Sequence, residues 1–405
     1  MRFKTVGIAI ISIFCYSFLV QWFVIALFFL GIATVTIDRI NAPLARKIST
    51  YLVVTFYVLG FVVIKTNLES RLILGYSVFA FSGISYIVEQ YKSKQNYSVF
   101  EGISFLFFFP KMLAGPIVKP NQLIPQLSAR YHWNVSLLFQ GLKLVVYGAF
   151  LKFILGDILI NISGLQLGIN AILETLIWAV RFYIDFYAYS IIAVGISHLL
   201  GIEIPYNFNA PYFANSFKSF WRRWNITLSF WLRDYVYIPL GGNRCSKSQS
   251  LINILITFVI SGLWHGLTLP FVLWGGIHGC LVSIENLLLN HWLSNKLFAI
   301  IYRSCAIFVI MILWELFRCN DFSDIQLYVY RILDYSPLNH DTFVVMLLSL
   351  LTLLVIDNKQ FKDVILESPV SKFKITIEVS LFSIMLATLV LCPYKYSFDF
   401  FYLNF

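Results

Sequence analysis

The chain has 405 residues, of which 59% are hydrophobic and 12% are charged, and its formal net charge is +10. Soluble domains carry about 25% charged residues, so half that share over this length excludes an ordinary water-exposed globule. The charges are also confined between long uncharged stretches, and this arrangement indicates a protein that crosses a membrane several times.

Seven stretches without a charged residue are candidates for membrane crossing. About 20 mostly apolar helical residues span a bilayer core, so the runs of 33 and 37 residues fit two helices each and the others fit one. Less clean spans are expected at 136–160, 173–181 and 298–317. The seven stretches are Thr5–Ile37, Ile48–Ile64, Leu72–Val88, Phe186–Ile202, Ser248–Ile284, Thr342–Ile356 and Val379–Tyr394.

These runs are continuous rather than alternating, which excludes a transmembrane β-barrel. We therefore predict an all-α, polytopic integral membrane protein with roughly nine to eleven transmembrane helices. No internal repeat or Pro/Gly/Ser-rich linker divides the chain. A single membrane domain over 1–405 is expected, with N-terminal spans in 1–99 and C-terminal spans in 286–405.

The basic residues predict the orientation of the loops. Lys and Arg are retained on the cytoplasmic side of membrane proteins, and they crowd the loops at 218–247 and 359–374, whereas 319–341 is acidic. We expect the two basic loops to be cytoplasmic and the C-terminus to be extracytoplasmic. The excess of positive charge then reports topology, and no nucleic-acid partner is expected.

Polar residues at membrane depth are costly and usually mark a site, and the first such group lies near 181–190. Arg181 and Asp185 are four residues apart, and we interpret the two charges as a structural ion pair on one helix face. Tyr183, Tyr187 and Ser190 repeat at spacings of four and three and give that face a polar lining. A substrate pathway would look similar.

The second group is the Trp- and Arg-rich segment 216–235. Its composition is typical of an interfacial amphipathic helix, with tryptophans at headgroup depth and arginines toward phosphate. On such a helix Asn225 would share a face with Trp221, Leu228 and Ser229. An inward-facing Asn225 could orient a substrate or donate a hydrogen bond to a developing oxyanion.

The third group lies in the 37-residue uncharged run. His265 and His278 are each followed by a glycine, which leaves space for a substrate or another backbone beside the imidazole. Pro270 lies between them and should break or bend the helix. This pattern predicts a distorted segment that lines a cavity, although either histidine could instead hydrogen-bond across a helix interface. A neutral imidazole is a competent general base.

Other chemistry has little support. The six cysteines form no C-x-x-C pair, so we expect neither a metal site nor redox chemistry. The phosphate-binding, dinucleotide-binding, zinc-protease and nucleophile-elbow motifs are missing from the sequence.

Several ordered motifs between about 100 and 285 resemble the membrane-bound O-acyltransferase (MBOAT) family, above all its bacterial branch around the alginate O-acetylation membrane subunit. The matching text is Phe108-Phe109-Pro110-Lys111-Met112-Leu113-Ala114-Gly115-Pro116, the Asp185 segment, Asn207-Phe208-Asn209-Ala210-Pro211-Tyr212, Phe220-Trp221-Arg222-Arg223-Trp224-Asn225, Trp231-Leu232-Arg233-Asp234-Tyr235, Ile238-Pro239-Leu240-Gly241-Gly242-Asn243-Arg244, Leu263-Trp264-His265-Gly266 and Trp274-Gly275-Gly276-Ile277-His278-Gly279.

The resemblance implies re-entrant or interfacial segments around a central tunnel. It implies that His265 is the catalytic histidine, and that the family's second site residue, histidine or asparagine, falls on Asn225. Close alginate-type relatives usually carry histidine at that position. The side chains expected to line the tunnel are His278, Asp185, Tyr183, Trp264 and Trp221.

Acyl transfer to a hydroxyl from a thioester such as acetyl-CoA is the implied reaction. His265 would accept the hydroxyl proton, and Asn225 would orient the acceptor or donate to the oxyanion. Arg222, Arg223 and Arg233 could attract the phosphates of the donor. Acetyl-CoA is expected as a co-substrate, and no bound cofactor is expected.

The branch implies a bacterial plasma-membrane protein that serves O-acetylation of a cell-surface or exported polysaccharide, with a separate extracytoplasmic transferase as partner. Three alternatives stay open. The chain could transfer D-alanine from a carrier protein to teichoic acid, although the intact 238–244 motif favours the polysaccharide branch. It could be a proton-coupled transporter or flippase, or an inactive scaffold that recruits another enzyme.

Overall fold

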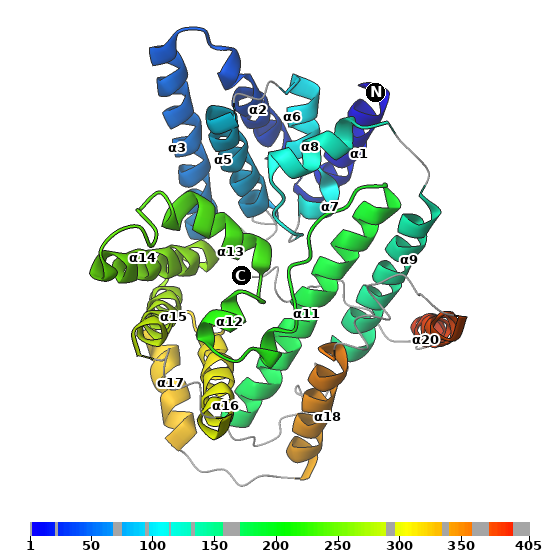
Figure 1. Cartoon of the computed structure of the whole chain (residues 1–405), viewed down its shortest axis with the longest axis vertical. Coiled ribbons are helices and arrows are strands. Elements are labelled where there is room, and N and C mark those ends of the chain that lie inside the picture. Colours follow the sequence, from blue (N-terminus) through cyan, green and yellow to red (C-terminus); the bar gives the residue numbers. More distant parts are fainter. Residues whose placement is uncertain are drawn as a thin grey trace. The chain divides into compact units, whose positions relative to one another are not determined.

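In the computed structural model, every regular element of the described residues is a helix, as predicted. The helices differ widely in length (Figure 1). The residues that the structure describes are 2–20, 23–67, 75–93, 97–112, 115–130, 134–156, 171–288, 296–333, 340–358 and 372–391. The predicted extracytoplasmic C-terminus therefore lies outside the described residues.

The chain packs as two compact units, and the first comprises residues 1–145 and 193–205. Lys111 of the motif around Pro110 is fully buried there, where it donates a 3.0 Å hydrogen bond to Ser82 and lies over the ring of Phe105. Its helices are α1 (Arg2–Val20), α2 (Phe23–Thr36), η1 (Ile37–Arg39), α3 (Pro43–Asn67), α5 (Tyr76–Ser93), α6 (Val99–Leu106), α7 (Phe109–Met112), α8 (Pro120–Ser128) and most of α9 (Val135–Phe150).

The second unit comprises residues 146–192 and 206–405 and holds every candidate site residue. The long helix α11 (Ala171–Leu199) belongs mostly to it. Its other helices are η2 (Leu151–Gly156), η3 (Pro211–Phe213), α12 (Phe217–Trp221), α13 (Ile226–Leu232), η4 (Arg233–Tyr237), α14 (Lys247–His265), α15 (Leu269–Leu288), α16 (Lys296–Leu313), η6 (Trp314–Phe317), α17 (Phe322–Leu333), α18 (His340–Ile356) and α20 (Lys372–Leu391).

Five helices of the described part are long and apolar enough to cross a membrane. They are Pro43–Thr66, Val135–Gly156, Ala171–Leu199, Lys247–His265 and Leu297–Phe317. Three shorter apolar helices, Thr5–Cys15, Val344–Ile356 and Val379–Leu391, add to them. The segment 173–181 leads into the uncharged stretch 186–202, as expected, and most of both lies in one continuous helix, α11, which ends at Leu199.

The 37-residue uncharged run folds as a helical hairpin, α14 and α15 (Figure 1). Ser246 caps the start of α14 by accepting a hydrogen bond from the Gln249 backbone, and the helix ends at His265. The next helix begins at Leu269, so Pro270 sits in its first turn, where its missing N–H costs nothing. The predicted break before Pro270 is therefore confirmed.

Glycines bring the two helices of the hairpin together at backbone distance. A Cβ at Gly262 would clash with the Phe271 carbonyl, and one at Gly275 would clash with the Phe258 carbonyl. Only a residue without a side chain permits these approaches. The glycine pattern of the hairpin therefore sets the separation and register of α14 and α15.

The neighbouring glycines Gly275 and Gly276 offer a matched test of this contact, because a Cβ at Gly276 would meet nothing within 4 Å. We expect Gly275→Ala to lower the unfolding temperature of the detergent-solubilised protein, since overpacking costs about 1–3 kcal/mol. Gly276→Ala should leave that temperature unchanged or raise it, because alanine favours helix. Equal unfolding temperatures for the two variants would contradict the backbone contact.

Candidate active site

The hairpin places both histidines against one tryptophan, Trp274. His265 is the last residue of α14, and its ring lies 5.3 Å from Trp274 and 4.7 Å from Phe317, measured between centroids. His278 follows Trp274 by one helical turn on α15, with the rings 5.0 Å apart. His265 is partly exposed, whereas His278 is fully buried. Only His265 is therefore open to a reactant without movement of its neighbours.

The space left by the glycine after each histidine is filled by the protein itself. A Cβ at Gly266 would collide with the ring of Phe271, and one at Gly279 would lie 3.1 Å from the Leu255 Cα. The expected close approach is thus made by a ring and a backbone. Phe271 also faces the His265 ring at 6.1 Å, so Gly266 serves to fix the imidazole against an aromatic side chain.

The predicted amphipathic helix over 216–235 is wrong, because the segment breaks at Asn225. The helix α12 ends at Trp221 and α13 begins at Ile226. Asn225 itself adopts the left-handed conformation, with φ 40° and ψ 56°. It therefore does not share a helix face with Trp221, as we expected from the spacing.

Hydrogen bonds from the segment around Asn207 stabilise this interruption between α12 and α13. The backbone of Asn207 accepts a hydrogen bond from the Ile226 N–H, and its side chain accepts one from the Thr227 hydroxyl at 2.6 Å. The Asn209 N–H donates to the Arg223 carbonyl. Asn207 is buried, with 2% of its surface exposed. The motif that contains it is therefore a structural brace for Asn225, a role that the sequence did not reveal.

The left-handed conformation at position 225 partly explains why the residue there is an asparagine. Among residues with a side chain, asparagine, aspartate and histidine are the ones most often found with positive φ. Asn225 is 7% exposed. The backbone requirement and a catalytic role for the amide therefore favour the same residue, and an experiment must separate them.

Aromatic rings connect Asn225 to the histidines. Trp224 packs on Trp314 at 4.7 Å, and Trp314 lies 5.8 Å from Trp274. On the other side Trp221 lies 5.4 Å from Trp274 and 4.9 Å from His278. Trp264 lies beside His265, with the ring centroids 4.3 Å apart. Of the predicted tunnel-lining residues, Trp221, Trp264 and His278 therefore belong to one cluster of rings around His265.

The buried imidazole of His278 is a second polar side chain in that cluster. Both of its ring nitrogens are buried and have no hydrogen-bond partner among the described residues. Trp314 and Phe317, on η6, complete the cluster, although the sequence did not single them out. The signal that could have found them is the acidic Glu315 between them at the end of an apolar span.

A buried carboxylate anchors α12 to the hairpin. Glu285 of α15 accepts hydrogen bonds from the Ser216 hydroxyl at 2.8 Å, the Lys218 N–H at 3.2 Å and the Tyr302 hydroxyl at 2.9 Å. The charge thereby compensates free N–H groups at the start of a helix, where the backbone dipole favours an anion. This contact fixes the start of the segment that leads to Asn225.

Asp185 and Tyr183 lie in a separate polar group of the same unit. The Asp185 carboxylate forms a buried ion pair with Lys152, 2.7 Å from its Nζ, and the Tyr183 hydroxyl donates to Asp357 at 2.6 Å. Tyr183 and Tyr187 stack with centroids 5.6 Å apart, so they share a face as predicted. Sequence reasoning missed Lys152 and Asp357, because Lys152 comes from η2 and Asp357 from the turn after α18, both distant in the chain.

The tyrosine face and the histidine cluster meet through Trp224. Its ring lies 5.7 Å from Tyr183 and 4.7 Å from Trp314. Tyr183 is therefore joined to the His265 cluster through packed rings.

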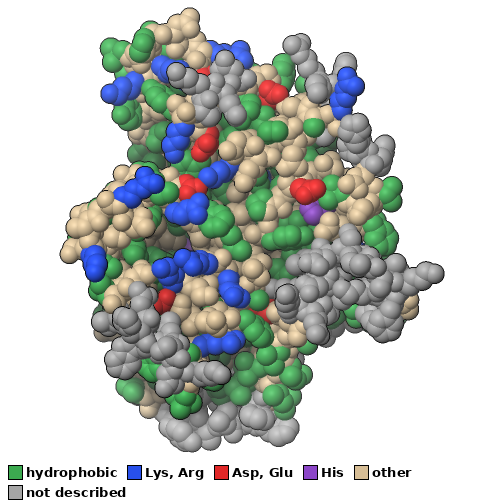
Figure 2. Space-filling view, in the orientation of Figure 1, with side chains coloured by type: hydrophobic (Ala, Val, Ile, Leu, Met, Phe, Trp, Pro, Cys, Tyr) green, Lys and Arg blue, Asp and Glu red, His purple; other side chains and the backbone are tan. Residues whose placement is uncertain are grey.

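The predicted arginines differ in their surroundings. Arg222 is exposed, while Arg223 is partly buried and donates to the Ala210 carbonyl at 3.4 Å. Arg233 is exposed, pairs with Asp234 at 2.7 Å and lies over Phe230. Figure 2 shows Lys and Arg side chains gathered over the face of α12 to α14. This surface could attract an anionic donor.

Within the described residues, no three side chains of His, Cys, Asp and Glu converge as metal ligands. Cys319 lies two residues after Phe317, and burial raises the pKa of its thiol to about 11. The thiol is therefore protonated at neutral pH and is a poor nucleophile. The partly exposed imidazole of His265 stays the candidate reactive group of the cluster.

A comparison with protein families covers the region that contains this site. The family model described as MBOAT, membrane-bound O-acyltransferase family, matches residues 86–320, more than half of the chain. The chain belongs to the MBOAT family. The matched region includes every candidate site residue and covers the motifs that resembled the family in the sequence.

Relatives of this MBOAT protein include the probable alginate O-acetylase AlgI of Pseudomonas aeruginosa, 34% identical over 53% of this chain and 43% of that protein. The peptidoglycan O-acetyltransferase of Helicobacter pylori is 36% identical over 45% of this chain and 36% of its own. The teichoic acid D-alanyltransferase of Bacillus subtilis is 30% identical over 53% and 58%. The chain thus spans about half the length of these relatives or less.

The buried pair Lys152–Asp185 yields a prediction for stability. Removing one partner of a buried pair leaves an uncompensated charge, which typically costs about 3–5 kcal/mol. We therefore expect Lys152→Met to lower the unfolding temperature strongly. Lys152→Met combined with Asp185→Leu should be more stable than Lys152→Met alone, because the orphaned charge is gone. Additive destabilisation in the double variant, measured by thermal unfolding in detergent, would contradict an ion pair that matters for folding.

Proposed function

We propose that this MBOAT protein transfers an acetyl group from acetyl-CoA to a hydroxyl, for O-acetylation of a cell-surface or exported polysaccharide. The observation that carries the proposal is a partly exposed histidine at a helix end, fixed by aromatic rings that also lead to Asn225. The names of the alginate and peptidoglycan relatives support acetyl transfer to polysaccharides.

In this mechanism the acceptor oxygen attacks the carbonyl carbon of the thioester while its proton moves to the His265 imidazole. The negative charge that develops on the carbonyl oxygen is met by the Asn225 amide. The C–S bond then breaks, and the thiolate of coenzyme A leaves and takes the proton from the imidazolium. An aromatic site that excludes water strengthens each of these interactions.

The arginines are proposed to bind the donor. Arg222, Arg223 and Arg233 would pair with the phosphates of acetyl-CoA, because guanidinium groups bind phosphate with directed hydrogen bonds. The basic surface in Figure 2 supports this assignment. This surface would lie on the cytoplasmic side of a bacterial plasma membrane. Acetyl-CoA is made in the cytoplasm.

The acetyl group must then reach a glycan outside the cell. We propose an extracytoplasmic acetyltransferase as the partner that accepts it. The tunnel implied by this route would be lined by His278, Asp185, Tyr183, Trp264 and Trp221. The aromatic contacts among Trp221, Trp264 and His278 support a shared environment for three of them.

His265→Ala should reduce surface O-acetylation by at least about 100-fold, since a general base contributes about 10²–10⁴-fold. The measurement is ester acetate released from the cell surface of a deletion strain that carries each variant at equal membrane levels. His198→Ala removes an imidazole from the other unit and serves as the control that retains activity. Wild-type acetylation in the His265→Ala strain would overturn the mechanism.

Asn225→Gly separates the two roles of Asn225, because glycine adopts positive φ at no steric cost. If the amide donates to the oxyanion, this variant should keep its unfolding temperature yet lose about 10²–10³-fold in rate. Asn225→His preserves both a donor and the backbone preference and should retain more activity than Asn225→Gly. Full activity in Asn225→Gly would reduce Asn225 to a backbone role.

The identity of the acyl group distinguishes the proposed function from D-alanyl transfer, which the Bacillus subtilis relative names. Mild alkaline release of surface esters, followed by mass spectrometry, should yield acetate that disappears in the His265→Ala strain. Release of D-alanine instead of acetate would contradict the assignment of acetyl-CoA as donor and of a polysaccharide as acceptor. The function would then be D-alanyl transfer to teichoic acid.

A further inference from the structure

The turn η6 contacts the surroundings of both residues of the proposed catalytic pair. Its Phe317 ring lies 4.7 Å from the His265 ring, measured between centroids. Its Trp314 ring lies 4.7 Å from the ring of Trp224, the residue that precedes Asn225. Both rings of the turn are buried. A displacement of η6 would therefore disturb His265 and the segment of Asn225 together.

The orientation of His265 depends on the rings around it. His265 is the last residue of α14, and the backbone of Gly266 after it is extended. Side chains on a helix lean over the turn that precedes them, so no later turn of α14 covers the imidazole. The side chain is also partly exposed. Its position is therefore set by packed rings, of which Phe317 comes from η6.

Two charged side chains tie η6 to the start of α11. Glu315 is buried, and its Oε2 accepts hydrogen bonds from the Thr175 hydroxyl at 2.9 Å and from the Arg318 guanidinium at 3.1 Å. Another nitrogen of Arg318 lies 2.6 Å from Glu174 Oε1. Thr175 and Glu174 are neighbours on α11, and Arg318 is the residue that ends η6. Arg318 therefore bridges a carboxylate of the turn and a carboxylate of α11.

The shape of the guanidinium group suits this bridge. Its nitrogens form a planar fork of directed donors, whereas a lysine ammonium is a point charge. The guanidinium carbon of Arg318 also lies 5.9 Å from the centroid of the Trp178 ring, one helical turn after Glu174 on α11. That distance is within the range of a cation–π contact. Contacts with both α11 and η6 thus fix the position of the arginine.

We propose that Arg318 is a positioning residue for the acyl transfer. By bridging Glu174 and Glu315 it fixes η6, and Phe317 then holds the His265 imidazole in its reactive orientation. This role rests on the proposed function, because the orientation of His265 affects the rate only where the imidazole takes part in the reaction.

The test measures the release of coenzyme A from acetyl-CoA by purified protein in nanodiscs with a hydroxyl acceptor, at equal amounts of folded protein. Arg318→Gln should lower kcat by about 10- to 100-fold, because a misplaced catalytic group loses rate on that scale. The KM for acetyl-CoA should change by less than about twofold, since Arg318 is not part of the proposed donor site. Arg318→Lys keeps the charge without the fork and should recover part of the loss.

Arg331 offers a matched control. It pairs with the other oxygen of Glu174, at 2.7 Å, but it lies on α17 rather than on η6. Arg331→Gln should therefore keep the kcat of the wild type. The same pair leaves Glu174 with a partner when Arg318 is replaced, so Arg318→Gln should still fold.

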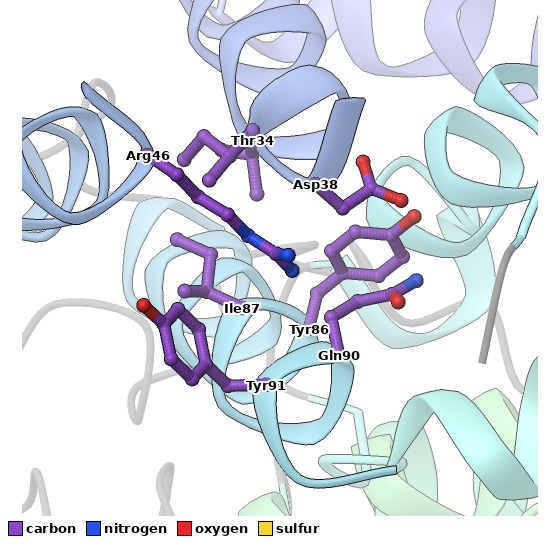
Figure 3. A pocket seen from close by; sticks show the side chains of 8 residues that line it. Thr34, Asp38, Arg46, Tyr86, Ile87, Gln90 and Tyr91 are labelled. Carbon is purple, nitrogen blue, oxygen red and sulfur yellow. The ribbon is translucent and has the colours of Figure 1, made fainter. Parts of the chain in front are cut away.

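A second control lies in the first unit, which holds none of the candidate site residues. Arg46 lies 5.1 Å from the centroid of the Tyr91 ring. Figure 3 shows it extending from α3 into a small pocket that Tyr86 and Gln90 of α5 also line. Arg46→Gln removes a partly buried arginine over an aromatic ring, as Arg318→Gln does, and should also keep the wild-type kcat.

The His265→Ala background shows whether Arg318 acts through the imidazole. Adding Arg318→Gln to His265→Ala should cause little further loss, because the group that Arg318 positions is gone. A further loss as large as the one measured with His265 present would overturn the proposal, and so would equal kcat values for Arg318→Gln and Arg331→Gln. If Arg318→Gln does not fold, the isosteric Glu315→Gln should lower kcat in the same direction, and an unchanged kcat in that variant would overturn the proposal.

Failure of this role and failure of the proposed function give different results. Loss of rate in His265→Ala with wild-type kcat in Arg318→Gln would overturn the positioning role alone. Undiminished kcat in His265→Ala would overturn the acyl-transfer mechanism on which that role rests.

Discussion

The backbone contact between α14 and α15 is the constraint on which the site depends. At Gly262 and Gly275 no side chain fits between the two helices. This contact brings Trp274 against His265 and sets His278 one turn further along α15. Glu285, near the end of the same helix, then holds the start of α12. Both halves of the proposed catalytic pair are thus positioned from α15.

Much of the fold could be predicted because lipid replaces water as the solvent. Uncharged runs predicted the helical membrane protein, and Pro270 predicted a break or bend of the helix between His265 and His278. The histidine was prominent for the same reason, since polar side chains are rare in such a chain. The ordered motifs around Trp264 and Trp224 then indicated the family that the comparison confirmed.

The parts of the fold and of the site that the sequence did not predict depend on contacts between distant segments. Helical spacing placed Asn225 on one face with Trp221, but hydrogen bonds from Ile226 and Thr227 to Asn207 hold it in a left-handed turn. Lys152 of η2 pairs with Asp185, and Asp357 from the turn after α18 pairs with Tyr183. Local periodicity carries no information on such pairs.

The central claim is that His265 acts as the base in acyl transfer. Purified protein in nanodiscs, given acetyl-CoA and a hydroxyl acceptor, tests it most directly through release of free coenzyme A. The account predicts thiol release by the wild type and a loss of at least about 100-fold in His265→Ala at equal folded protein. Undiminished release of coenzyme A by His265→Ala would contradict the claim. If the wild type releases no coenzyme A even after the proposed extracytoplasmic partner is added, a transporter or a scaffold would be favoured instead.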